Sequence, residues 1–115
     1  MNATIDSFVA PPVALLVARG ELDIALRDDL HTRLVELANA ESATRLNLDL
    51  GGLTFIDCVC LRELDTARRA WDLAGRRFEV VAASPTVRRI AECARYFELV
   101  GIPSPRVHNT AAQWC

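Results

Sequence analysis

Apolar residues are spaced differently in successive segments of the chain. Val13–Ala18 is a continuous apolar run between Pro12 and Gly20, which is typical of a buried strand. Residues 45–50 alternate leucine with polar side chains, so they predict a strand with one buried face. We expect Ile5–Val9 to form a further strand at the edge of the same sheet.

Three segments show the three- and four-residue spacing of amphipathic helices. They cover residues 24–39, residues 58–74 and a stretch from Pro85 to Phe97. Each has a single apolar stripe, so each is expected to lie on the surface of the sheet. A residue whose side-chain oxygen can accept hydrogen bonds from free N–H groups stands before each helix. These capping residues are Asp23, Asp57 and Ser84.

Glycines and a further apolar run complete the pattern. Residues 20–23 and the Gly51–Gly52 pair are interpreted as turns, the second leading into residues 53–56. Gly75 is a typical helix end, and residues 78–83 predict another strand.

The order of these elements predicts an α/β fold. Strands that alternate with helices pair in parallel, so we expect a small mixed, mostly parallel β-sheet covered by amphipathic helices. The 115 residues fit one domain, 1–115. In the tail, Val107 predicts a short strand and residues 110–115 predict the start of a final helix.

Charge and composition exclude several classes of function. The formal net charge is −2 and no basic run is present, which gives nucleic-acid binding little support. All 13 basic residues are arginine, so the chain has no lysine for a Schiff base or a phosphate loop. Without a leader or an apolar run of spanning length, we expect a cytoplasmic protein with no membrane partner. Cysteines in that compartment are thiols by default; here they are Cys58, Cys60, Cys93 and Cys115.

Residues 54–61, Thr-Phe-Ile-Asp-Cys-Val-Cys-Leu, carry the most distinctive chemistry. Asp57 follows an apolar segment and precedes a helix, so Cys58 is expected at the exposed N-terminal end of that helix. Unpaired N–H groups and the positive end of the helix dipole favour a negative group at this position. The stretch therefore predicts a site for a thiolate, a phosphate or an acidic partner.

Five motifs follow one another in the order and spacing of a known family. They are Gly20-Glu21-Leu22-Asp23, Leu46-Asn47-Leu48-Asp49-Leu50, Thr54-Phe55-Ile56-Asp57, Cys58-Val59-Cys60-Leu61 and Ser84-Pro85-Thr86-Val87-Arg88-Arg89. Over residues 10–101 the chain resembles STAS domains, and among them bacterial anti-sigma factor antagonists. The resemblance implies a STAS-like single domain, with the N-terminal strand and the C-terminal tail at its edges.

The resemblance also implies a function. In the family the central turn reads Asp-Ser-Ser-Gly-Leu, and an anti-sigma factor with serine-kinase activity phosphorylates its first serine. The unphosphorylated antagonist binds this kinase and releases a sigma factor, so transcription is regulated by partner switching. By position, the serine corresponds to Cys58 and the acid that contacts the partner to Asp23. A thiol is not a substrate for an ordinary serine kinase, so we expect partner binding without phosphorylation at the usual site.

Two further positions depart from the family pattern. Val59 stands in place of the second serine, and Cys60 puts a side chain where the family has glycine. The resemblance implies a monomer or weak dimer that binds its protein partner through this turn. The expected partner-binding residues are Asp23, Asp57, Cys58, Val59, Cys60 and Leu61.

The thiols leave an alternative open. A cysteine at a helix N-terminus has a lowered pKa, so Cys58 and Cys60 also predict a STAS domain that senses redox state or a small ligand. Their spacing is shorter than that of structural zinc pairs, and neither His31 nor His108 is close in sequence. We therefore expect no bound metal. Both thiols are equally consistent with small residues that have no function of their own.

An enzymatic role has the least support. Asp23, Asp49 and Asp57 are acids near predicted strand ends, as in a phosphoryl-accepting pocket, but such pockets also require lysine. The sequence shows no nucleophile–base pair, glycine-rich phosphate loop or metal-ligand cluster, so we expect no enzyme and no cofactor. His31 lies on the polar face of the first helix and is expected in solvent rather than as a ligand or base.

Overall fold

The computed structural model describes residues 3–101 and shows a four-stranded sheet. The strands lie in the order β1, β2, β3, β4, and their bounds are Ala3–Ala10, Val13–Leu22, Arg45–Ile56 and Arg77–Ala83. β1 pairs antiparallel with β2, and the β2–β3 and β3–β4 pairs are parallel. The sheet is therefore mixed and mostly parallel, which confirms the predicted fold class.

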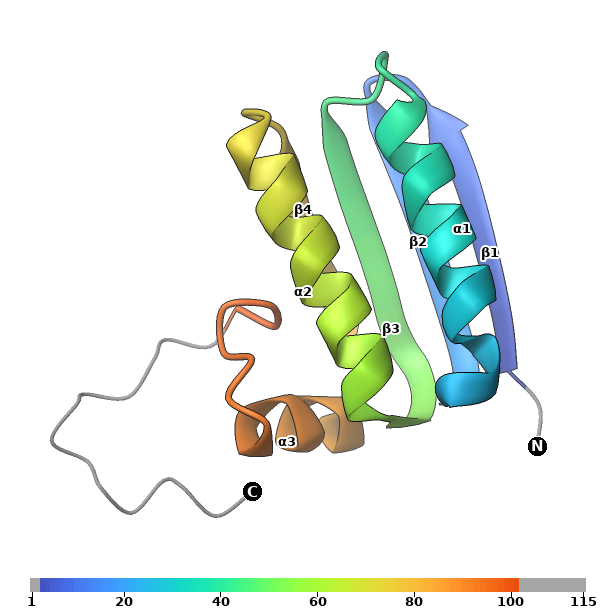
Figure 1. Cartoon of the computed structure of the whole chain (residues 1–115), viewed down its shortest axis with the longest axis vertical. Helices are drawn as coiled ribbons and strands as arrows, with labels where there is room; N and C mark the ends of the chain where they lie inside the picture. The colour runs from blue at the N-terminus through green and yellow to red at the C-terminus, as the bar shows by residue number, and fades with distance from the viewer. Residues whose placement is uncertain (1–2, 102–115) are drawn as a thin grey trace, which may run out of the picture.

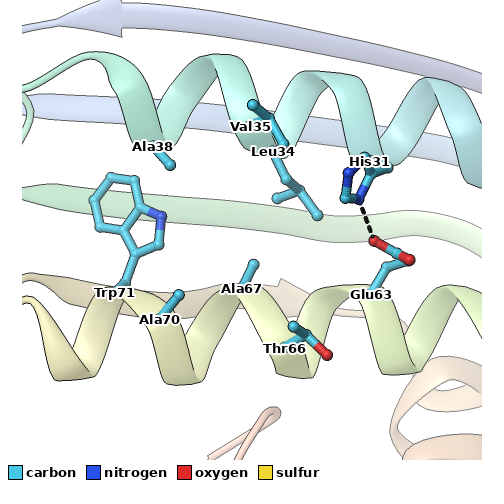
Figure 2. Close-up of a pocket in the computed structure, with 9 residues that line it drawn as sticks. All are labelled: His31, Leu34, Val35, Ala38, Glu63, Thr66, Ala67, Ala70 and Trp71. Carbon is cyan, nitrogen blue, oxygen red and sulfur yellow. Dashed lines mark hydrogen bonds and ion pairs between the residues drawn. The ribbon is translucent and has the colours of Figure 1, made fainter.

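The helices lie in one layer and leave the other face of the sheet open (Figure 1). Their bounds are Ile24–Leu26 for the short 3₁₀ helix η1, Arg27–Asn39 for α1, Cys58–Leu73 for α2 and Pro85–Cys93 for α3. α1 and α2 run side by side over the sheet, and α3 lies at one end of it. Side chains of α1 and α2 line a groove between the two helices (Figure 2).

The core lies between the sheet and this helix layer. Alternate residues of the central strands point into it and are fully buried, while their neighbours lie on the open face. These buried strand residues are Ala14, Leu16, Ala18, Leu46, Leu48 and Leu50. The helices contribute the apolar stripes that the sequence predicts, including Leu30, Leu34, Leu37, Leu61 and Leu64. The alternating apolar residues of the strands and the apolar stripes of the helices thus pack together in a single core.

All three predicted caps are confirmed by hydrogen bonds. Asp57 Oδ1 accepts from the backbone N–H of Cys60 at 2.9 Å, and Ser84 Oγ accepts from that of Val87 at 3.2 Å. Asp23 Oδ1 accepts from the N–H of Ala25 at 3.0 Å and caps η1, which precedes α1. The helix starts were predictable because each cap is a local, side-chain-to-backbone interaction.

Two predicted turns are wrong. Residues 20–22 belong to β2, and β3 passes through Gly51 and Gly52 without turning. Glycine is needed at position 52 because of the neighbouring strand, since a Cβ there would lie only 2.9 Å from Arg19 Cγ. Glycine allows β2 and β3 to approach here, where their register shifts between Val17 and Arg19.

The third long helix is shorter than predicted. α3 ends at Cys93, and Arg95 adopts a left-handed backbone conformation with φ of 66°. The N–H of Tyr96 then donates to the carbonyl of Ala91, which closes the helix end. Phe97 therefore lies outside the helix. The expectations for Val107, residues 110–115 and Cys115 fall outside the described residues.

Candidate functional site

Two acidic residues come together where the parallel strands β2 and β3 end. Leu22 and Ile56 are register partners, and Asp23 and Asp57 follow them directly. The N–H of Asp57 donates to the carbonyl of Leu22 at 3.1 Å, which joins the two strand ends. Asp23 and Asp57 are therefore neighbours at one end of the sheet, where η1 and α2 begin.

Asp49 does not join this pair. It lies within β3 rather than at its end, because the strand continues to Ile56. Its Oδ1 accepts from the N–H of Gly51 at 3.0 Å. The three acids considered for a phosphoryl-accepting pocket are thus not assembled into one.

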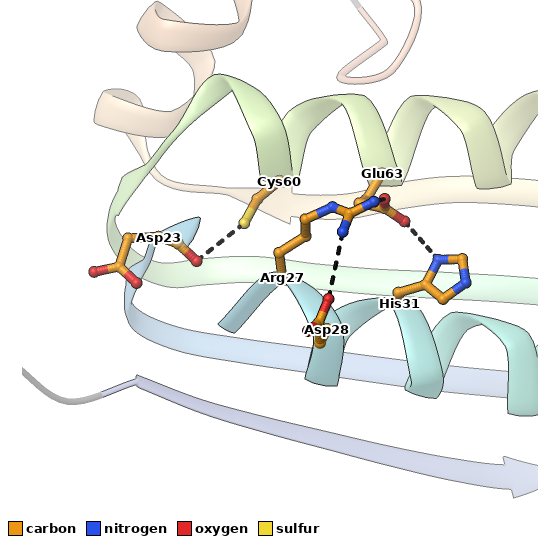
Figure 3. Close-up of polar contacts among 6 residues, drawn as sticks. All are labelled: Asp23, Arg27, Asp28, His31, Cys60 and Glu63. Atoms are coloured by element: carbon orange, nitrogen blue, oxygen red, sulfur yellow. Dashed lines mark hydrogen bonds and ion pairs between the residues drawn. The ribbon is translucent and has the colours of Figure 1, made fainter. Parts of the chain in front are cut away.

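Cys60 lies inside the molecule. Its side chain is fully buried, and its Sγ–H donates to the carbonyl of Asp23 at 3.3 Å (Figure 3). Burial raises the pKa of Cys60 from 9.0 to about 12, and the nearby Asp57 carboxylate adds to the effect. At neutral pH Cys60 is a protonated thiol that fastens η1 to the first turn of α2.

This burial divides the expected partner-binding residues into two groups. Cys60 and Leu61 are fully buried and belong to the core. Cys58 is exposed, and Asp23, Asp57 and Val59 are half-buried. Only these four contribute to the surface of the turn.

Two exposed apolar residues at the same end of the sheet were not predicted as part of the site. Ile24 follows the Asp23 cap and is 66% exposed, and Phe55 near the end of β3 is 42% exposed. Both side chains lie at the end of the sheet that carries Asp23 and Asp57, where they are available for contact with another protein. The sequence offered one signal for Ile24, an apolar side chain directly after an N-cap, but none for Phe55.

An ionic bridge holds α1 and α2 together next to this surface (Figure 3). Glu63 on α2 binds Arg27 at 3.0 Å and His31 Nδ1 at 2.8 Å, both from α1. The Glu63 side chain is 15% exposed, so the bridge is partly shielded from water. His31 is exposed, as predicted, but it contacts Glu63 instead of standing in solvent alone.

The described residues give little support to a thiol or metal centre. Within residues 3–101 no group of three or more His, Cys, Asp or Glu side chains is placed to hold a metal ion. Cys58, Cys60 and Cys93 are all free thiols, and the raised pKa of Cys60 opposes its oxidation with Cys58. None of the helices in the described part of the chain is long and apolar enough to cross a membrane.

Comparison with known proteins gives the family. A family model described as a STAS domain of the MlaB type matches residues 10–101. The chain belongs to the STAS domain family. No curated protein matches its sequence.

Solved structures show the same STAS fold at low sequence identity. An anti-sigma factor antagonist from Mycobacterium paratuberculosis is 22% identical with a TM-score of 0.75, covering 96% of this chain and 94% of that one. A putative anti-sigma factor antagonist from Thermotoga maritima is 16% identical with a TM-score of 0.71, covering 90% and 88%. The phosphorylated Bacillus cell-fate determinant SpoIIAA is 14% identical with a TM-score of 0.68, covering 91% and 94%.

Proposed function

We propose that this STAS domain is a non-enzymatic regulator that binds an anti-sigma factor through the end of its sheet. The surface used is called here the docking surface. It consists of Asp23, Ile24, Phe55, Asp57, Cys58 and Val59. It combines exposed apolar side chains with two carboxylates, the mixture expected of a protein interface that forms and dissociates.

The observation that carries this proposal is the position of Cys58. It is exposed at the first position of α2, directly after the Asp57 cap and beside the end of β2. If the resemblance in sequence extends to this turn, Cys58 is the counterpart of the serine that is phosphorylated in antagonists. A partner that recognises that turn would meet sulfur here in place of the hydroxyl oxygen.

The proposed partner is an anti-sigma factor with serine-kinase activity, and binding would release a sigma factor from it. Because position 58 offers a thiol, the kinase has no hydroxyl to phosphorylate there. The antagonist then stays in its binding-competent form, and the protein acts constitutively instead of being switched off by phosphate.

The experiment combines a pull-down with intact mass measurement. Wild type, Cys58→Ser and Cys93→Ser are incubated with ATP and each candidate anti-sigma kinase of the same genome. Cys93 is half-buried on α3 and is not one of the docking-surface residues, so Cys93→Ser controls for a cysteine-to-serine change at another position.

We expect all three proteins to bind one kinase, and only Cys58→Ser to gain one phosphate. Phosphate on wild type would contradict the constitutive role. If no candidate kinase binds any of the three, the partner-binding function itself is wrong.

A further inference from the structure

The open face of the sheet carries an apolar patch that stays partly exposed within residues 3–101. The continuous apolar run Val13–Ala18 of β2 is the pattern of a strand buried on both faces. Its even-numbered residues lie in the core, but its odd-numbered residues lie on the face opposite the helix layer. Phe8 of β1 pairs with one of them, Leu15, and is 56% exposed. The apolar patch consists of Phe8, Val13, Leu15 and Val17. β2 therefore has two faces suited to burial, and the helices cover one of them.

The strand register arranges the open face in three rows, each with one residue from every strand in the order β1 to β4. The middle row is Phe8, Leu15, Asn47 and Glu79. The basic row on one side of it is Ala10, Val13, Arg45 and Arg77. The acidic row on the other side is Asp6, Val17, Asp49 and Ala82. The two outer rows thus carry opposite charges, and the apolar residues of β2 cross all three.

This arrangement makes the open face complementary to a copy of itself. When a second chain is turned end over end about the middle row, each strand lies antiparallel over its own copy. The basic row of one chain then lies over the acidic row of the other. Leu15 meets its own copy, Val13 meets Val17, and Arg45 meets Asp49. Two sheets that pack face to face in this way bury the side chains between them in a layer about 10 Å thick.

The remaining charges of the face are compatible with this packing. Arg45 binds Glu79 of its own chain at 2.6 Å, which balances the negative charge of Glu79 where it meets its own copy at the edge of the sheet. The Arg45 guanidinium has five N–H donors, so it can also bind Asp49 of the second copy. Arg77 and Asp6 are exposed on the edge strands β4 and β1, so both stay in contact with water at the rim.

We propose that the open face of the sheet is an interface between two copies of this chain, related by a two-fold axis along the middle row. The apolar patch forms its centre, and two Arg45–Asp49 pairs fix its orientation. The apolar area is small, so the dimer is weak and depends on concentration. None of the docking-surface residues belongs to the three rows, so the dimer does not rest on the proposed function.

The test measures the mass of the full chain by sedimentation equilibrium from micromolar to millimolar concentration, with a reductant so that thiols cannot link two chains. We expect the mass of wild type to rise from that of one chain towards that of two. Leu15→Asp places two carboxylates opposite each other at the two-fold axis and should weaken the dimer at least about tenfold. Leu73→Asp is the matched control, because Leu73 is 88% exposed on α2 in the helix layer, and it should leave the dimer unchanged. A wild type that stays monomeric at millimolar concentration, or equal dimer affinities for wild type and Leu15→Asp, would overturn the proposal.

An exchange of charges tests the orientation of the two copies. Arg45→Glu and Asp49→Arg each place like charges opposite one another, so each single variant should weaken the dimer about tenfold. The double variant restores opposite charges and should recover most of the wild-type affinity. Circular dichroism checks that all variants fold. If the double variant dimerises no better than the single variants, the two copies are not related by this axis and the inference is wrong.

Discussion

Cys58 and Cys60 are two positions apart, yet they meet opposite environments. Cys58 is exposed at the first position of α2, whereas Cys60 is fully buried and donates to the carbonyl of Asp23. A residue two positions along a helix is rotated by about 200°, so one thiol faces outward and the other the core. Only Cys58 is therefore placed to meet a partner.

The raised pKa of Cys60 gives the protein a specific pH dependence. The unfolded thiol ionises near pH 9, but the folded one retains its proton until about pH 12. The contribution of Cys60 to the free energy of unfolding is fully present below pH 9. It is lost as the pH rises from 9 towards 12, by up to about 1.4 kcal/mol per pH unit.

We expect Cys60→Ala to show a shallower loss of stability than wild type between pH 8.5 and 10.5, measured by urea unfolding. Cys58→Ala removes an exposed thiol and should keep the wild-type slope. Identical slopes for wild type and Cys60→Ala would show that the Cys60 pKa is not raised.

At the scale of elements, β3 depends on a glycine that makes room for its neighbour. Gly52→Ala would place a Cβ 2.9 Å from Arg19 Cγ, so the Arg19 side chain or one of the two strands must shift. We expect a loss of about 1–3 kcal/mol in the free energy of unfolding. Arg19 is exposed, so adding Arg19→Ala should restore most of this loss. If the double variant is no more stable than Gly52→Ala, the clash is not the cause.

The same glycine shows how far the elements could be predicted from sequence. The structure confirms the helix caps at Asp57 and Ser84, which depend on hydrogen bonds between residues close in sequence. It also confirms the strand predicted from the alternating leucines of β3. The Gly51–Gly52 pair has the local pattern of a turn. The real reason for glycine at position 52 is the close approach of Arg19 on β2, and the local sequence does not show it because Arg19 lies more than thirty positions away. The end of α3 was missed because the apolar spacing continues to Phe97, while the left-handed Arg95 stops the helix.

The candidate site was predicted only in part for the same reason. The motif order placed Asp23 and Cys58 at the turn, and the β2–β3 register joins Asp23 to Asp57. Which side chains face water is set by tertiary packing. Burial of Cys60 and exposure of Ile24 and Phe55 therefore had to come from the structure.

At the scale of the whole molecule, Arg76 connects the parts of the helix layer. It follows the end of α2, stacks on Trp71 and donates to three carbonyls at and after the end of α1. Its planar guanidinium reaches several acceptors at once, which an ammonium group cannot do.

We expect Arg76→Ala to lower the free energy of unfolding by about 2–4 kcal/mol, because it leaves these carbonyls and the Trp71 ring without their partner. Arg76→Lys should recover less than half of the loss. The measurement is urea unfolding at pH 7, with Arg62→Ala on the exposed side of α2 as the control. Full recovery by lysine would mean that the positive charge alone stabilises this region, and not the several N–H donors of the guanidinium.

Two exposed phenylalanines, one on the docking surface and one outside it, allow partner binding to be assigned to that surface. Phe55 belongs to the docking surface, while Phe8 lies on β1 and is 56% exposed. The affinity of the proposed partner, an anti-sigma kinase, is measured for wild type, Phe55→Ser and Phe8→Ser. The account predicts that Phe55→Ser weakens binding at least about tenfold and that Phe8→Ser leaves it within about twofold. Equal affinities for the two variants, or a loss confined to Phe8→Ser, would contradict the docking surface.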